Sequence, residues 1–158
     1  VDPAINARVE GVDGDTVADY ADALRAGKKL PPVKVFEDKG GVKWLADGFH
    51  RRNAHVRAGL KVIPAEVVAG EREDAALFAA SANQTHGLRR TNADKRRAVE
   101  IILKLRPDWS LVQIAEHAGV DHKTARVVRG QLVNAGLKVP DKVVGKDGRV
   151  QSSTRKPK

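Results

Sequence analysis

The stretch SLVQIAEHAGVDHKTARVVRGQL, residues 110–132, decides the fold of the second half of the chain. Ser110 and Asp121 are residue types that favour helix N-caps, and each precedes a segment with helical apolar spacing. Between these segments, Gly119 can adopt the positive φ that a tight helix–helix turn requires. Small residues stand where the two helices would cross, namely Ala115 and Ala125. The spacing therefore predicts a helix-turn-helix.

The second helix of this pattern is polar and basic away from its partner. In helix-turn-helix proteins the start of that helix enters the DNA major groove. We therefore expect base contacts near its start and a phosphate contact further along. The candidates for base edges are His122, Lys123 and Arg126, with Thr124 beside them and Arg129 as the phosphate candidate. The alternative is an ordinary helical hairpin with a solvated face.

Charge is distributed unevenly along the 158 residues. Residues 1–80 hold 12 Lys/Arg and 13 Asp/Glu, a net of −1, whereas residues 81–158 hold 17 and 7, a net of +10. This asymmetry indicates a polyanionic partner for the second half. Cysteine is absent, which excludes disulfides, thiolate catalysis and cysteine–zinc sites. No apolar run approaches the ~20 residues of a membrane span, so no membrane partner is expected.

The first half reads as a mixture of helices and strands. A helix is expected after Asp15-Thr16, a β-hairpin over residues 33–46, and a third strand over 61–70, with Pro64 indicating an edge or an irregularity. Helices follow from Glu71, and Thr91 to Asp94 matches a capping box. The fold class is therefore α+β: a small mixed α/β domain over 1–90, an all-helical helix-turn-helix domain over 91–136, and a basic flexible tail over 137–158.

A second informative stretch is ADGFHRRNAH, residues 46–55, where a strand leads into a helix. Gly48 lets the backbone approach a ligand closely, and the helix start offers free N–H groups and the positive end of the dipole to an anion. His50, Arg51 and Arg52 add positive charge, although three consecutive helical residues point about 100° apart and cannot all serve one phosphate. A phosphate cradle and a solvated basic helix start are both open interpretations of this stretch.

The order of these segments over about residues 5–132 resembles the ParB family of partition proteins, within the ParB/sulfiredoxin superfamily. Gly48, Arg51 and Ala54 match the family's second nucleotide motif, while Phe49 and His50 depart from it. The same stretch is similar to the Gly-Cys-His-Arg of sulfiredoxin, but Phe49 replaces the cysteine, so sulfiredoxin chemistry is excluded. Three further matches are weaker. Residues 30–35 match the family's segment of proline followed by a strand, Ile5 and Arg8 match its first nucleotide motif, and Asn83 matches its third.

The resemblance implies a nucleotide-binding first domain. Its ligand would be a nucleoside triphosphate, CTP by preference, with Mg²⁺, and whether the nucleotide is hydrolysed stays open. The site residues that the resemblance implies are Arg8, Gly48, His50, Arg51 and Asn83, with Asn83 near the nucleotide-bound Mg²⁺.

The expected function is that of a ParB-like DNA-binding protein in which nucleotide acts as a switch by ordering residues 85–90. The expected partners are double-stranded DNA, a nucleotide and a second copy in a homodimer, in a cytoplasmic location at the nucleoid or a plasmid. The alternatives are a ParB-like nuclease or phosphotransferase, or a transcription regulator with a vestigial nucleotide site. Only Asp47 and Glu66 lie near the motif to hold a catalytic metal, which ranks the nuclease lower.

Overall fold

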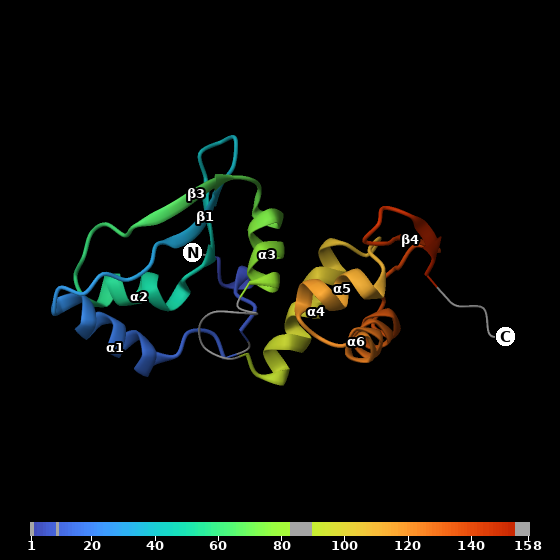
Figure 1. The fold of residues 1–158 in the computed structure, drawn as a ribbon, viewed down its shortest axis with the longest axis horizontal. Coiled ribbons are helices and arrows are strands. Elements are labelled where there is room, and N and C mark those ends of the chain that lie inside the picture. Colours follow the sequence, from blue (N-terminus) through green and yellow to red (C-terminus); the bar gives the residue numbers. More distant parts are fainter. Residues whose placement is uncertain (1, 9, 83–89, 154–158) are drawn as a thin grey trace. The chain divides into compact units, whose positions relative to one another are not determined.

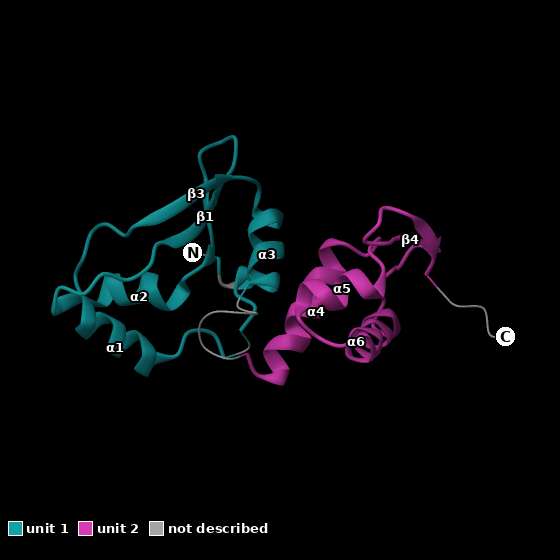
Figure 2. Ribbon diagram, in the orientation of Figure 1, with its two compact units in different colours: residues 1–82 teal, residues 83–158 magenta. Residues whose placement is uncertain are grey.

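The computed structural model describes residues 2–8, 10–82 and 90–153. The chain divides into two compact units, unit 1 over Val1–Ala82 and unit 2 over Asn83–Lys158 (Figure 2). Asn83 and residues 85–89 of the expected switch segment lie outside the described residues. Each unit has its own buried apolar core.

Unit 1 mixes helices and strands, as its sequence predicts (Figure 1). Its elements are η1 (Pro3–Ile5), α1 (Gly14–Arg25), β1 (Val33–Glu37), β2 (Lys43–Asp47), α2 (Phe49–Arg57), β3 (Ala65–Ala69) and α3 (Arg72–Ser81). The strand order is β2-β1-β3, with β1 antiparallel to β2 and parallel to β3. The predicted hairpin is therefore confirmed. The structure also confirms an edge position for the third strand, which begins directly after Pro64.

Alternation along β1 sends its side chains to two faces of the sheet. Val33 and Val35 are buried on one face with Leu45, where Phe49 at the start of α2 packs against them. Phe36 points to the other face and meets Phe78 of α3, with ring centroids 5.7 Å apart. The helix α1 packs on α2. Its N-cap is Asp13 rather than the expected Asp15-Thr16, because the Asp13 carboxylate accepts the Thr16 N–H at 2.7 Å.

The described part of unit 2, residues 90–153, contains three helices and a β-hairpin. These are α4 (Asn92–Leu105), α5 (Leu111–Ala118), α6 (His122–Asn134), β4 (Lys142–Val144) and β5 (Val150–Ser152). The predicted capping box is present at the start of α4, where Thr91 and Asp94 each accept the other's backbone N–H. Ser110 and Asp121 cap α5 and α6, and Gly119 between them has φ 65°. The predicted helix-turn-helix is thus confirmed in its local geometry.

The expected basic flexible tail over residues 137–158 is wrong for residues 142–152, which form the β4–β5 hairpin. Val143 is 3% exposed, so the hairpin contributes to the core of unit 2. The Ser110 N–H donates to the Val144 carbonyl at 2.8 Å, and the Val144 N–H donates to the Asp108 carbonyl at 2.7 Å. These bonds fasten the hairpin to the segment that joins α4 to α5. Residues 154–158 of the expected tail lie outside the described residues.

None of the helices in the described ranges combines the length and the apolar character that a membrane crossing requires.

Candidate nucleic-acid interface

The orientation of α6 is fixed from within unit 2. Ala125 and Val128 are 0% and 1% exposed, so one side of the helix is committed to the core. At its start, Asp121 accepts the Thr124 N–H at 2.8 Å and the Thr124 hydroxyl proton at 2.7 Å. These hydrogen bonds, the backbone one first, lower the pKa of Asp121, so its charge persists at the positive end of the helix dipole. The opposite side of α6 is therefore held toward solvent.

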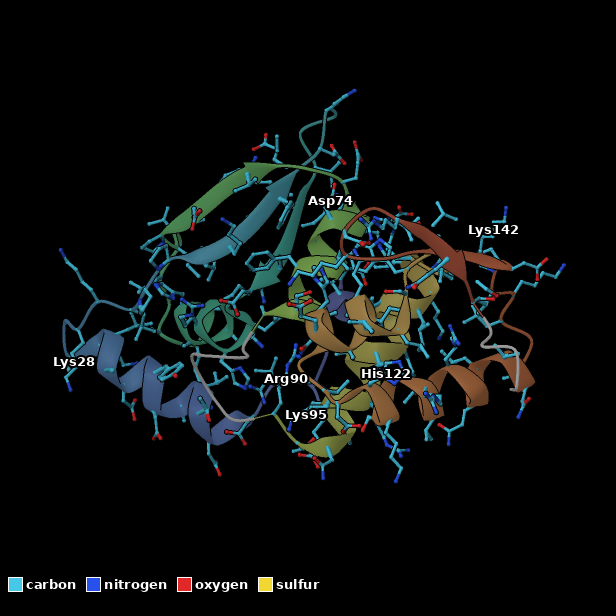
Figure 3. All side chains as sticks on the ribbon, turned by 45° about the vertical axis from the view of Figure 1, so that its right-hand side comes forward. Lys28, Asp74, Arg90, Lys95, His122 and Lys142 are labelled. Carbon is cyan, nitrogen blue, oxygen red and sulfur yellow. The ribbon has the colours of Figure 1, made fainter. Side chains whose placement is uncertain are left out.

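Three of the predicted DNA-binding residues occupy that outward side. His122, Lys123 and Arg126 are exposed, and Figure 3 labels His122 at the start of the helix. The sequence of α6 contains Lys123, Arg126 and Arg129 and no acidic residue. A helix that buries small apolar groups on one side and presents basic ones on the other can approach phosphates and base edges together.

The other two predicted residues are engaged within the chain. Thr124 is half-buried and its hydroxyl belongs to the N-cap of α6. Arg129 is half-buried and its Nη2 donates to the Ser153 carbonyl at 3.0 Å, which joins α6 to the end of the hairpin. Burial, with the nearby charge of Arg126, lowers the pKa of Arg129 from its usual value. Thr124 and Arg129 thus stabilise α6 through contacts within unit 2, and they lie beside the exposed basic residues of the helix.

The outward side of α6 also contains two residues that selection by charge overlooks. Val127 is 41% exposed, and Gly130 is exposed one turn further on. Their spacing from Lys123 is i, i+4 and i+7, which places all three on one helical face. The spacing is visible in the sequence, but it indicates Val127 and Gly130 only once the structure shows which side of α6 is buried.

The candidate nucleotide residues of unit 1 gather at the start of α2. Gly48 is the N-cap of α2, with φ 94°. A Cβ at Gly48 would lie 2.6 Å from Val33 Cγ1 and 3.1 Å from an Arg51 nitrogen. The positive φ and the lack of space both require glycine here, so the fold alone accounts for this residue.

Arg51, the expected phosphate ligand, is bound inside unit 1. Its Nη2 donates to Asp47 Oδ2 at 2.7 Å, and its Nη1 donates to the carbonyls of Pro31 and Pro32 at 3.1 and 2.7 Å. The side chain is 18% exposed. Arg51 therefore ties the start of α2 to the segment before β1, and a phosphate would have to displace these partners.

His50 and Arg8 are brought together at the same end of α2. His50 Nε2 accepts the Asp13 N–H at 3.0 Å, so the neutral ring has its proton on Nδ1. Burial lowers the pKa of His50, the charge of Arg8 lowers it further, and Asp13 opposes the shift. Of the five expected nucleotide residues, the described structure thus groups Arg8, Gly48, His50 and Arg51, while Asn83 lies outside it. In the described parts of the chain, no three His, Asp or Glu side chains gather to hold a metal ion.

Comparison with known proteins gives two informative relatives, whereas no family model matches the chain. This chain is 30% identical over 138 residues to the streptomycin biosynthesis operon possible regulatory protein of Streptomyces griseus. The match covers 87% of this chain and 38% of that protein. It is 29% identical over 120 residues to the transcriptional regulator NovG of Streptomyces niveus, covering 76% and 36%. The chain spans less than two fifths of the length of these curated relatives. Neither name refers to partition proteins or sulfiredoxin, and over most of its length the chain is similar to proteins named as regulators.

Proposed function

We propose that unit 2 binds double-stranded DNA through α6 and that the chain is the DNA-binding part of a transcription regulator. The observation that carries this proposal is the outward display of His122, Lys123 and Arg126 opposite the buried side of α6. The net charge of +10 over residues 81–158 supports it, because phosphate contacts release counterions and dominate DNA affinity. The names of the two relatives point the same way.

The test is DNA binding by matched variants of the intact chain. A preferred site is first selected from random duplex DNA, and affinity for it is then measured by fluorescence anisotropy over a range of salt concentrations. Lys123→Ala and Arg126→Ala are each expected to lose about 1–3 kcal/mol and to relax sequence preference, if they contact bases. Lys104→Ala, an exposed lysine on α4, is the control with the same charge change. Equal losses for all three would indicate diffuse charge rather than a recognition helix.

A second proposal concerns unit 1, which we infer binds a nucleoside triphosphate with Mg²⁺ at the start of α2 and thereby biases DNA binding. The resemblance to ParB proteins favours CTP, and the proximity of Arg8 to His50 supports an anion there. The partners of Arg51 argue against its direct role, so the proposal now depends on Arg8, the Gly48 backbone and His50. Asn83 keeps its proposed role near the Mg²⁺.

Isothermal titration of the intact chain with CTP, ATP and GTP, with and without DNA, tests this second proposal. Binding by one nucleotide that changes the DNA affinity, and the reciprocal change, would support a switch. Heat changes indistinguishable from dilution at millimolar nucleotide would leave unit 1 as a scaffold and favour the regulator with a vestigial site. Sedimentation with and without DNA tests the expected homodimer in the same samples.

A further inference from the structure

The outward side of α6 is not uniformly charged. At about 100° per residue, Lys123, Val127 and Gly130 fall within roughly 60° of one another. They lie opposite Ala125 and Val128, which are buried in the core of unit 2. The outward side therefore holds a valine and a glycine next to the basic Lys123.

Val127 is a large apolar side chain on the exposed side of α6. Its side chain is 41% exposed, and β-branched residues are mediocre helix formers, so neither burial nor helix propensity explains valine at this position. A single exposed valine is unremarkable on a protein surface. Gly130, one turn further along α6, provides a second and independent observation.

Gly130 is not required by the chain itself. It lies inside α6, is absent from the glycines with positive φ, and a Cβ added there would meet nothing within 4 Å. Glycine inside a helix destabilises it relative to alanine. The residue thus weakens the helix without serving any described contact, whereas an external backbone that approaches α6 closely would need its missing Cβ.

We propose that Val127 and Gly130 form the centre of the DNA-reading face of α6. Val127 contacts the C5 methyl of a thymine in the major groove, and Gly130 lets the DNA backbone approach the helix. Duplex DNA is the occupant that the charge favours, because Lys123 and Arg126 are exposed on the same helix and α6 holds no acidic residue. Thymine is the base that offers a methyl group to an apolar side chain in that groove. This inference rests on the proposed DNA binding by α6.

The proposed contact of Val127 with thymine is tested by removing methyl groups from each partner, the base and the side chain. In the selected duplex, each thymine is replaced in turn by deoxyuridine, which lacks only the methyl. Loss of one buried methyl corresponds to about a fourfold loss of affinity. At one position the intact chain should show that loss, and Val127→Ala should show none, because its partner is already gone. Val133→Ala, the same change at a valine 44% exposed on the same helix, should leave every deoxyuridine effect in place.

Gly130→Ala tests the close approach. The variant is expected to unfold a few degrees higher than the parent, because alanine is the better helix former, and yet to bind the selected duplex at least severalfold more weakly. Unchanged affinity in Gly130→Ala would overturn the close approach. Identical deoxyuridine profiles in the parent and Val127→Ala would overturn the methyl contact. If Lys123→Ala and Arg126→Ala weaken binding in those same experiments, the DNA-binding proposal stands while this inference fails. If the chain selects no duplex at all, both fail.

Discussion

Replacing Arg51 with alanine separates a structural arginine from a phosphate ligand. In the structure its guanidinium holds the Asp47 carboxylate and the carbonyls of Pro31 and Pro32, so the substitution removes three hydrogen bonds within unit 1. The Asp47 side chain, which is 30% exposed, then loses this ion-pair partner. We therefore expect the main effect of Arg51→Ala to be on the stability of unit 1, with or without nucleotide.

The magnitude follows from the number and burial of these bonds. Hydrogen bonds to a charged group contribute about 1.5–3 kcal/mol each, and bonds that share one guanidinium do not add in full. A loss of about 2–4 kcal/mol is expected for Arg51, whose side chain is 18% exposed. For a unit of this size, 1 kcal/mol moves the melting temperature by about 4–8 °C, so a loss of about 2–4 kcal/mol should lower it by roughly 8–32 °C.

The measurement is thermal unfolding together with hydrogen exchange followed by mass spectrometry. Peptides from β1 and α2 should lose protection in Arg51→Ala, while peptides from α4 and α5 serve as an internal reference. Arg52→Ala is the matched control, because among the described residues the Arg52 guanidinium hydrogen-bonds only to its neighbour Asn53, at 3.1 Å. This substitution should change stability by less than about 0.5 kcal/mol.

The opposite result would refute this reasoning. If Arg51→Ala leaves the protection of unit 1 equal to that of Arg52→Ala but abolishes nucleotide binding, Arg51 is a ligand for phosphate and its internal bonds give way when nucleotide arrives. A structural role of Arg51 therefore predicts a loss of stability in Arg51→Ala, whereas a role as phosphate ligand predicts a loss of nucleotide affinity.

Three further substitutions test other contacts. Folding lowers the pKa of His50 below 6.5, so protonation of this residue favours the unfolded chain, and the stability of the fold should decline as the pH falls below about 6.5. His50→Gln should flatten this part of the pH profile of stability, and identical profiles for the parent and the variant from about pH 5 to 8 would contradict the role of His50. Val143→Ala should destabilise unit 2 by about 1–3 kcal/mol in urea titrations, whereas no change would restore the view of a structureless tail. Arg129→Ala should weaken binding to all DNA sequences about equally; a fall of about 0.9 in the salt slope would indicate a phosphate contact, and an unchanged slope a role in holding α6 to Ser153.

The helices of unit 2 were predictable because their signals are local. The caps at Thr91, Ser110 and Asp121 each depend on atoms within three residues, and Gly119 marks the turn by its own backbone freedom. The β4–β5 hairpin has a local signal only in its turn, at Lys146-Asp147-Gly148, where Gly148 has φ 76°. Its strands have three residues each, and its anchoring bonds join Val144 to Asp108 and Ser110, more than thirty positions away. A pattern read along the chain cannot register such pairing.

The expected site in unit 1 shows the same limit. The i, i+4 spacing of Asp47 and Arg51 was visible in the sequence, but the carbonyls of Pro31 and Pro32 reach Arg51 only after the sheet has formed. The residue pattern Gly-Phe-His-Arg therefore suggested a ligand where the fold supplies internal partners. The resemblance to ParB proteins and its nucleotide stay predictions, which the titrations above address.

The two units use positive charge in different ways. In unit 1, Arg51 is bonded to Asp47 and Arg72 to Asp2, each at 2.7 Å, and residues 1–80 carry a net charge of −1. In α6, Lys123 and Arg126 are exposed on a helix without acidic residues. Only charges that meet phosphate can release counterions, so the salt dependence of DNA binding should depend on unit 2. The charge distribution predicts that residues 81–158 meet a polyanion, while burial and spacing indicate the residues of α6 that we propose for this contact, including the uncharged Val127 and Gly130.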